Sequence, residues 1–267
     1  MYRIGVFATG RGQGSRGLLQ AIHDSIEAGH TPVDVAFVFS NREAGEFEAT
    51  DGFFDQVRDY GYPLVTSSFR KYRSSLSNAP GWRNNYEIDA LQRLEGYDAD
   101  ICLLAGFLLW VPEMCRRYTM INLHPAAPGG PTGMWQEVIW QLIESRAAKT
   151  GNTMLYVTEE LDKGPTATFS TYSIRGPAFD EHWELIEGKS VAEMKSSEGD
   201  SLPLFRAIRE AGVVRERPLV VETVKAFAEG RVAVKGEQVV DGAGRHVSGL
   251  DLTAEIESLV AAERRSG

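Results

Sequence analysis

A polar pair, Asn122 and His124, follows a short apolar segment near the middle of the chain, in the sequence Asn-Leu-His-Pro. The segment that begins at Met120 predicts a buried strand, and the functional residues of α/β proteins collect where such strands end. The amide of Asn122 can donate a hydrogen bond to a developing oxyanion, and the imidazole of His124 can exchange a proton near neutral pH. The pair predicts a catalytic site, with a satisfied core histidine as the alternative.

An acidic loop at 159–165, Glu-Glu-Leu-Asp-Lys-Gly-Pro, lies between two later predicted strands. Its Asp162, close to Gly164, could orient His124 or take a proton through a water molecule. A turn-forming aspartate is the alternative, because Asp and Gly are both common in turns. The combination of His124 and Asp162 favours catalysis more than either residue does alone.

A glycine-rich turn follows the apolar segment at 2–9 and precedes a helical pattern that starts at Leu18. The turn contains four glycines, Gly10, Gly12, Gly14 and Gly17. Glycines let backbone N–H groups come close to an anion, and the positive end of the following helix favours the same charge. Arg11 and Arg16 could add positive charge. The turn predicts a phosphate site, with a tight turn that binds nothing as the alternative.

The end of the second predicted strand argues against a nicotinamide dinucleotide. Dinucleotide-binding folds place an acidic residue there to hold the ribose. This chain has Phe39-Ser40-Asn41 at that point. The departure weakens the dinucleotide interpretation and leaves the phosphate interpretation in place.

Apolar segments that alternate with helical patterns must position these residues. Strands are predicted at 2–9, 33–40, 63–66, 101–105, 120–123, 153–157 and 166–174. Helices are predicted from Leu18 and from Pro112, and at 47–60, 84–94, 135–143, 204–208 and 219–227. The alternation predicts an α/β fold built on a doubly wound, mostly parallel sheet, which binds ligands at the carboxyl ends of its strands.

The remaining stretches have other patterns. We predict a loop at 67–81, an inserted loop or flap at 175–199, a hairpin at 232–240 and a helix at 252–262. The main domain is therefore predicted at 1–231 and a C-terminal extension at 232–267.

The composition excludes several classes of protein. Among 267 residues, Lys plus Arg number 28 and Asp plus Glu number 37, and this net charge of −9 argues against nucleic-acid binding. The chain has no apolar run of 18 residues and no signal-peptide pattern, so we expect a cytoplasmic protein without a membrane partner. Cys102 and Cys115 are too few for a disulfide framework or a cysteine-rich zinc site. The sequence does not decide whether the chain forms a homodimer.

Together these motifs resemble those of the folate-dependent formyltransferases. The similarity covers residues 2–231 and depends on motifs in the family's order, namely the glycine turn up to Gly12, Phe39-Ser40-Asn41, Ala105-Gly106-Phe107, Asn122-x-His124-Pro125, Leu161-Asp162-x-Gly164-Pro165 and a closing helix at 218–231. The NxHP and LDxGP motifs, in this order and spacing, are its most specific part. The resemblance implies a Rossmann-like formyltransferase fold.

The resemblance also implies a mechanism. In the family, an amine attacks the formyl carbon of the co-substrate 10-formyltetrahydrofolate, and no metal is needed. Asn122 and protonated His124 would stabilise the tetrahedral oxyanion. Asp162 would hold His124 and help to move a proton from the amine to the leaving folate nitrogen.

Two sets of binding residues for small-molecule substrates follow from the same resemblance. The substrate phosphate would be bound by Gly10, Arg11, Gly12, Gln13, Gly14 and Arg83. The folate would be bound by Phe107, Leu108, Leu109, Glu160 and Leu161. Because the turn resembles the family loop that holds the phosphate of glycinamide ribonucleotide, that purine precursor is the first predicted acceptor. A solvated arginine at a helix start is the alternative for Arg83.

Three departures from the family pattern concern the acceptor. The glycine turn is longer by the residues at 13–17. The loop at 126–135 after the His-Pro pair differs in sequence from the family pattern, and we call it the rewritten loop. Val213 stands where the family has a glutamate that binds the substrate ribose, with Glu210 or Glu216 as replacements. The chemistry is therefore expected to be kept, while the amine acceptor could differ.

Three other functions are weighed against this one. A formyltetrahydrofolate hydrolase would use water in the same site, but such enzymes carry an N-terminal regulatory domain and this chain starts at its first strand. A folate- or nucleotide-binding module would not need Asn122, His124 and Asp162. A methionyl-tRNA formyltransferase would need a basic RNA-binding domain, and only residues 232–267 follow the main domain.

Overall fold

The computed structural model describes residues 1–76, 81–107, 109, 111–160 and 163–266. Its strands are β1 (Tyr2–Phe7), β2 (Val33–Ser40), β3 (Leu64–Thr66), β4 (Ile101–Leu104), β5 (Met120–His124), β6 (Lys149–Tyr156), β7 (Thr166–Ser173), β8 (Val232–Lys235), β9 (Gln238–Asp241) and β10 (Leu250–Asp251). Its α-helices are α1 (Gln13–Glu27), α2 (Glu48–Asp59), α3 (Phe69–Leu76), α4 (Trp82–Arg93), α5 (Pro112–Arg117), α6 (Trp135–Glu144), α7 (Asp180–Glu184), α8 (Val191–Ser197), α9 (Pro203–Ala228) and α10 (Thr253–Ser266).

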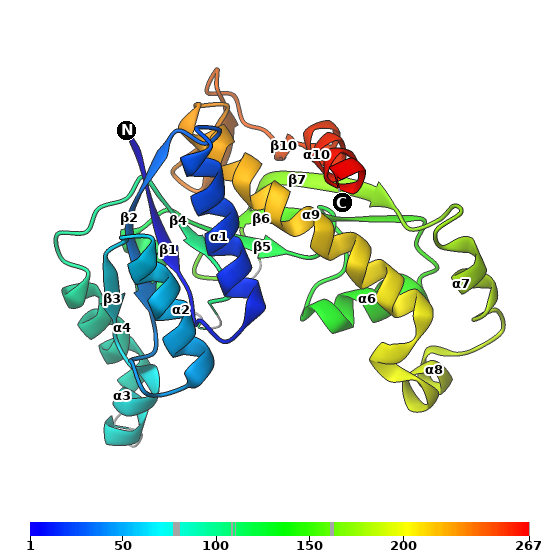
Figure 1. Cartoon of the computed structure of the whole chain (residues 1–267), viewed down its shortest axis with the longest axis horizontal. Coiled ribbons are helices and arrows are strands. Elements are labelled where there is room, and N and C mark those ends of the chain that lie inside the picture. The colour runs from blue at the N-terminus through cyan, green and yellow to red at the C-terminus, as the bar shows by residue number, and fades with distance from the viewer. Residues whose placement is uncertain (77–80, 108, 110, 161–162, 267) are drawn as a thin grey trace.

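Eight strands form one mostly parallel sheet in the order β10-β7-β6-β5-β4-β1-β2-β3, which confirms the predicted fold class (Figure 1). Five neighbouring strands of the sheet, β3, β2, β1, β4 and β5, run parallel to one another. β6 is antiparallel to both of its neighbours, β5 and β7. β1 lies between β2 and β4, so the chain order reverses at this strand. Crevices at the carboxyl ends of strands beside such a reversal are the usual ligand sites of α/β sheets.

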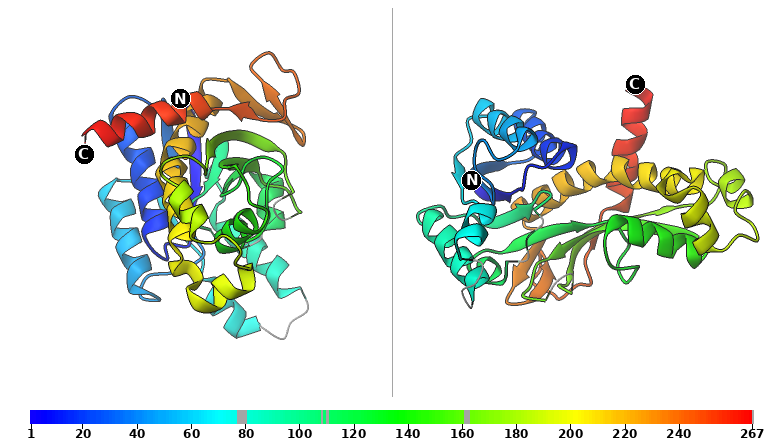
Figure 2. Two further views of the ribbon diagram at one scale, coloured as in Figure 1. Left: turned by 90° about the vertical axis from the view of Figure 1, so that its right-hand side faces the viewer. Right: turned by 90° about the horizontal axis from the view of Figure 1, so that it is seen from below.

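Helices cover both faces of the sheet (Figure 2). One face packs against α1, α2 and α9 through a core of aliphatic and aromatic side chains. The opposite face packs against α4 and α5 around Phe7, Phe37 and Phe39, which are fully buried. A third apolar cluster joins α6, α7, α8 and the first half of α9. None of the helices in the described part of the chain is long and apolar enough to cross a membrane.

The stretch at 67–81 contains a helix, so the predicted loop was wrong where the structure describes it. Two aromatic residues, Phe69 and Tyr72, stand three positions apart on α3 and face α4. The Phe69 ring lies 5.1 Å from that of Tyr86, and the Tyr72 ring lies 5.6 Å from it. Burial of these rings outweighs the low helix propensity of the serines around them.

The two late helices predicted at 204–208 and 219–227 are one continuous helix, α9. Pro218 lies inside it, where a missing N–H and a steric clash usually cost about 3 kcal/mol. Leu219, Val220 and Val224, directly after the proline, are fully buried. Their packing holds the second half of the helix in line with the first, which the sequence pattern alone does not reveal.

Two other segments also differ from the prediction. α1 starts at Gln13 rather than Leu18, so part of the glycine turn is helical. The segment at 175–199 forms α7 and α8 instead of an open flap. Trp183 and Met194 from these helices are buried in the third apolar cluster, which anchors the segment to α6 and α9.

The extension after residue 231 forms the predicted hairpin, β8 and β9, and the predicted helix, α10. The additional strand β10 joins the edge of the main sheet beside β7. Leu252, Ile256 and Val260 are buried at helical spacing against the main core. Arg215 of α9, itself buried, makes two hydrogen bonds to the carboxylate of Glu257 at 2.5 and 2.9 Å.

We predict that Ile256→Ala lowers the free energy of unfolding by about 2–4 kcal/mol, because it leaves a cavity in a core shared by α10 and the sheet. Ser258→Ala on the exposed side of the same helix is the control and should change stability by less than about 0.5 kcal/mol. Urea denaturation followed by circular dichroism measures both. A loss below about 1 kcal/mol for Ile256→Ala would show that α10 is not part of the cooperative core.

Candidate active site

The carboxyl ends of three neighbouring strands bring the predicted catalytic and phosphate-binding segments together. In the sheet register, Phe7 of β1 pairs with Leu104 of β4, and Leu104 pairs with Asn122 of β5. The glycine turn, the loop at 105–107 and the Asn-x-His-Pro motif therefore leave the sheet side by side. Asn122 is half-buried, and His124 is 8% exposed.

The glycine turn and the loop after β4 are in direct contact. The backbone N–H of Thr9 donates to the Gly106 carbonyl at 3.4 Å. Gly106 has a φ of +67°, and a Cβ there would lie 2.6 Å from Oγ of Ser15. Any larger residue would therefore be strained and would press on the first turn of α1. The close approach sets the relative position of the two loops.

The glycines of the turn serve different purposes. Gly10 has a φ of +69°, which favours glycine at that position. Gly12 caps α1 in an extended conformation, with a φ of 175°. A Cβ added at Gly12 or Gly14 would meet no atom within 4 Å. The space in front of the first turn of α1 is open, and the N–H groups of Gln13 and Gly14 there have no partner within the helix.

Arg42, which the sequence analysis missed, stands close to Arg11 beside this turn. Partial burial and, next, the charge of Arg11 lower the pKa of Arg42. Its guanidinium lies 3.8 Å from the centroid of the Phe47 ring and donates to Oγ1 of Thr50 at 2.9 Å. Among the described residues, neither arginine forms an ion pair. The position of Arg42 directly after β2 was the signal that could have identified it from the sequence.

The His124 ring is held by a backbone carbonyl. Its Nε2 lies 2.9 Å from the carbonyl oxygen of Pro131. A carbonyl can only accept, so Nε2 must carry the hydrogen. The neutral ring then has a bare Nδ1, and Nδ1 is the nitrogen that can gain and release a proton.

The rewritten loop after His124 is closed by a compact turn. Gly130 N–H donates to the Ala127 carbonyl at 2.9 Å, and Gly129 has a φ of +72°. Proline followed by a glycine with positive φ is typical of a type II turn. At the base of the loop, Thr153 Oγ1 donates to the carbonyl of Ala126 at 2.7 Å. Thr153 pairs with His124 across β5 and β6, so the bond fixes the chain directly after the histidine.

The predicted folate-binding residues are only partly described. The Phe107 ring is buried against Phe7, with centroids 5.7 Å apart, so its backbone is the part left for a ligand. Leu109 is half-buried, and Glu160 is exposed and paired with Lys163 at 2.8 Å. Leu108, Leu161 and the predicted catalytic Asp162 lie outside the described residues. The roles assigned to these residues stay predictions.

Arg83 and the acceptor-side glutamates have clear surroundings. Arg83 is exposed on the first turn of α4, and its guanidinium lies 5.6 Å from the Trp82 ring. Glu216 is paired at 2.5 Å with Arg209, whose guanidinium lies 4.8 Å from the ring of Trp135 at the end of the rewritten loop. Glu216, rather than the exposed Glu210, is therefore the carboxylate tied to this loop.

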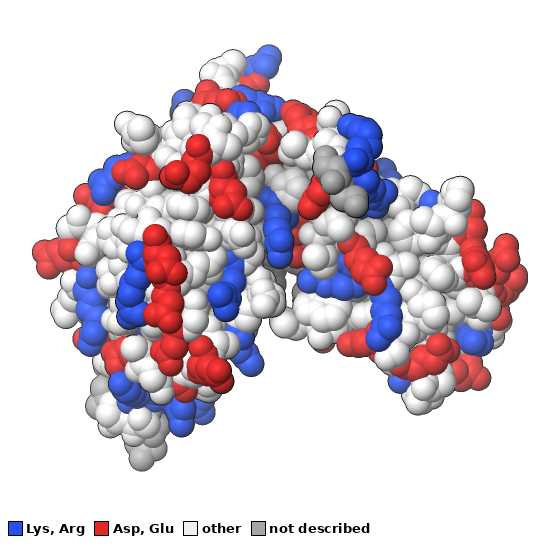
Figure 3. Space-filling view, viewed as in Figure 1, with Lys and Arg blue, Asp and Glu red and all other residues white. Residues whose placement is uncertain are grey.

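The molecule is hollowed beside this edge of the sheet, between the part that carries α2 and α3 and the part that carries α6 and α8 (Figure 3). Lys and Arg side chains border the hollow on both sides in this view. The described residues include no cluster of His, Cys, Asp and Glu suited to a metal ion. Burial raises the pKa of the Cys115 thiol to about 11, which leaves it a poor nucleophile near neutral pH.

Comparison with known proteins agrees with this arrangement. The family model described as "Formyl transferase" matches residues 2–175. The chain belongs to the formyl transferase family. The matched region contains the glycine turn, the Gly106 loop, the Asn-x-His-Pro motif and the acidic loop.

The chain resembles a formyltransferase, a transformylase and a deformylase. The chain is 27% identical over 161 residues to "Phosphoribosylglycinamide formyltransferase" of Escherichia coli K12, an alignment that spans 58% of this chain and 66% of that enzyme. The structure of glycinamide ribonucleotide transformylase 1 from Symbiobacterium toebii has 25% identity and a TM-score of 0.63, with 90% and 94% of the two chains covered. A formyltetrahydrofolate deformylase from Pseudomonas syringae pv. tomato shares the fold at 19% identity and a TM-score of 0.59, with 90% of this chain and 65% of that one covered.

We predict that Thr153→Val lowers the free energy of unfolding by about 1–3 kcal/mol, because it leaves the buried Ala126 carbonyl without a donor. Thr150→Val is the matched control on the same strand. Thr150 is equally buried, but its hydroxyl has no partner within the described part of the chain. Loss of the Thr150 hydroxyl should therefore leave the free energy of unfolding unchanged or raise it. Equal effects of the two substitutions in urea denaturation would contradict a specific role for the Thr153 bond.

Proposed function

We propose that this protein transfers the formyl group of 10-formyltetrahydrofolate to the primary amine of an acceptor that carries a phosphate, with glycinamide ribonucleotide as the first candidate. The observation that carries the proposal is the convergence, at one edge of the sheet, of an oxyanion donor, a proton-transfer histidine and a cationic turn. Asn122 and His124 supply the first two, and the amides at the start of α1 supply the third together with Arg11 and Arg42.

The cationic turn supports an anionic acceptor. The charge of Arg11 disfavours the charged form of Arg42, and the Glu46 carboxylate offsets only part of this effect, so an anion bound beside the two guanidinium groups would be favoured. The free N–H groups and the positive end of α1 point to the same space. Because Gly12 and Gly14 leave that space open, a phosphate can approach the backbone directly.

The reaction needs one bond to form, one to break and one proton to move. The acceptor nitrogen bonds to the formyl carbon, and the bond from that carbon to the folate nitrogen breaks. The amide of Asn122 donates to the oxygen that becomes negative in between. His124, protonated on Nδ1 as well as Nε2, stabilises this oxyanion and passes its Nδ1 proton to the leaving folate nitrogen. The proton that the acceptor nitrogen loses returns to Nδ1 and restores the ring.

Asp162 completes this proposal as the group that favours protonated His124. A carboxylate near an imidazole stabilises the charged ring. The LDxGP motif follows β6 in the sequence, and β6 pairs with β5, the strand that ends at His124. This role is carried over from the resemblance.

Folate binding is proposed along the loop after β4. Gly106 brings the loop to within contact of Ser15, and the buried Phe107 ring fastens it to the core. A backbone that a buried ring holds in place suits a flat, hydrogen-bonding ring such as a pterin. Leu109 is the described apolar side chain that remains half-exposed beside it.

A formyl-transfer assay of the purified chain tests the proposed function. Production of tetrahydrofolate that depends on glycinamide ribonucleotide, with the formylated amide detected by mass spectrometry, is the expected result. Tetrahydrofolate formed equally fast without any amine would identify water as the acceptor instead. Folate binding without turnover under any condition would contradict an enzymatic role.

We predict that His124→Ala reduces formyl transfer by at least about 100-fold, because it removes both an oxyanion-stabilising group and a proton donor. Folate affinity, measured by calorimetry, should change little. His246→Ala, at an exposed position in the extension, is the control and should keep full activity. Near-normal turnover in a folded His124→Ala protein would remove His124 from the mechanism.

We predict that Gly12→Val raises the KM for the acceptor by about tenfold or more while the KM for folate changes less than about twofold, since a side chain there would occupy the phosphate space. The extended φ and empty surroundings of Gly12 mean that the protein itself tolerates the change. Gln20→Val, on the exposed side of α1, is the control. An effect on the folate KM alone would reverse the assignment of the two subsites.

A further inference from the structure

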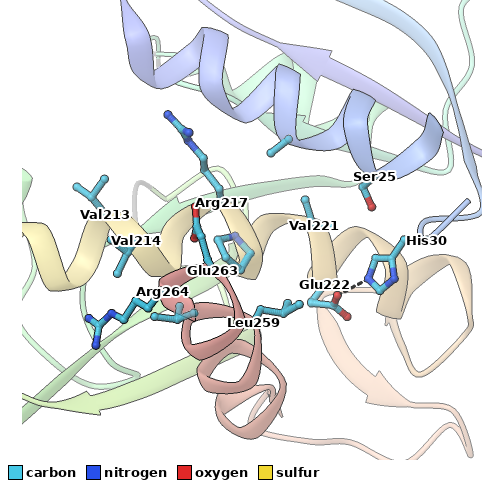
Figure 4. Close-up of a pocket in the computed structure, with 13 residues that line it drawn as sticks. Ser25, His30, Val213, Val214, Arg217, Val221, Glu222, Leu259, Glu263 and Arg264 are labelled. Atoms are coloured by element: carbon cyan, nitrogen blue, oxygen red, sulfur yellow. Dashed lines mark hydrogen bonds and ion pairs between the residues drawn. The ribbon is translucent and has the colours of Figure 1, made fainter. Parts of the chain in front are cut away.

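A groove of about 590 Å³ lies on the outside of the molecule, between α1, α9 and α10 (Figure 4). α1 contributes Ala21 and Ser25 near its C-terminal end, whereas the candidate active site is at the other end of this helix. The proposed function therefore makes no use of this groove.

The groove gathers exposed apolar side chains. Among the described residues, eight large hydrophobic side chains are more than about one-third exposed, and three of them line this groove. Val213 and Val214 of α9 are 37% and 38% exposed, and Leu259 of α10 is 39% exposed. A cluster of this kind is typical of an interaction surface.

α10 presents one apolar side to the protein and leaves another uncovered. Ile256 and Val260 are buried against the main core, while Leu259 between them is exposed. In the right-hand view of Figure 2 the helix stands clear of the rest of the molecule, and in the left-hand view it lies along the top of the molecule. A helix of 14 residues has little stability of its own, so a projecting end gains from a partner.

The charges around the groove are of both signs. Arg217, Glu263 and Arg264 line it, and none of them forms an ion pair with another residue of the described chain. At the far end, His30 Nε2 lies 2.5 Å from the Glu222 carboxylate. This balance does not suit a polyanion such as nucleic acid, which needs an excess of positive charge.

We propose that this groove is a homodimer interface in which the projecting half of α10 of each copy packs against α9 and α1 of the other. Two copies related by a twofold axis present the same patch to each other, so the patch must be self-complementary. Apolar Leu259 and Val214 can face apolar residues, and the Glu263 carboxylate of one copy can face a guanidinium of the other. A stable interface of standard size buries roughly 800 Å² per partner, so the groove and the face of α10 beside it would have to be covered together.

Sedimentation equilibrium of the whole chain tests the proposal. The wild type should sediment at twice the chain mass of 29.5 kDa over roughly 1–100 µM, since interfaces of standard size have dissociation constants of micromolar or below. Leu259→Glu should raise the dissociation constant by about 100-fold or more, because it buries a charge in an apolar contact. Ile88→Glu changes an equally exposed apolar residue on α4, outside the groove, and should leave the dimer intact.

A second variant, Arg264→Glu, tests the interface independently in case Leu259→Glu impairs folding. Arg264 is exposed and unpaired in the described chain, so its replacement should leave the circular dichroism melting curve unchanged and still weaken the dimer by about tenfold. A wild type that stays monomeric over the whole range would overturn the proposal. A dimer that is equally stable in Leu259→Glu and Ile88→Glu would also overturn it, because the contact would then lie elsewhere.

Discussion

The pairing of β1 with both β2 and β4 is the constraint on which the candidate site depends. It places the glycine turn at the point where the chain order of the sheet reverses, and there the loops on either side diverge and leave a crevice. The register from β1 through β4 to β5 then brings Asn122 and His124 to the same edge. The glycine turn and Asn122 are more than 100 residues apart in the sequence, and this register is what brings them close in space.

The loop after His124 illustrates how one geometry can be reached with a different sequence. The chain replaces the residues usual in the family with Ala-Ala-Pro-Gly-Gly-Pro. The positive φ of Gly129 and the hydrogen bond from Gly130 N–H to the Ala127 carbonyl fit a type II turn, and the chain after the turn brings the Pro131 carbonyl to Nε2 of His124. The backbone of the loop, rather than one of its side chains, therefore supplies the group that orients the ring.

The acceptor side of the site differs more from the family pattern than the catalytic side does. Val213, which the resemblance aligns with the family's ribose-binding glutamate, lies in the outer groove. Glu216 instead bonds to Arg209, which stacks near Trp135 at the end of the rewritten loop. The rewritten loop and α9 are thus linked through the contacts of Arg209 with Glu216 and Trp135.

Local patterns in the sequence were sufficient for the fold class, the sheet strands around the site and the motifs that resemble formyltransferases. Apolar runs and glycine turns act over a few residues, and they predicted β1, β4 and β5 and the turn that precedes α1. They did not predict α3, because its stability comes from aromatic contacts with α4 rather than from its own serine-rich sequence. They also suggested two helices where there is one, because the packing that overrides Pro218 comes from distant segments. Arg42 was missed for the same reason: a lone arginine after a strand is ordinary in a sequence, and only the tertiary structure places it beside Arg11 and the open start of α1.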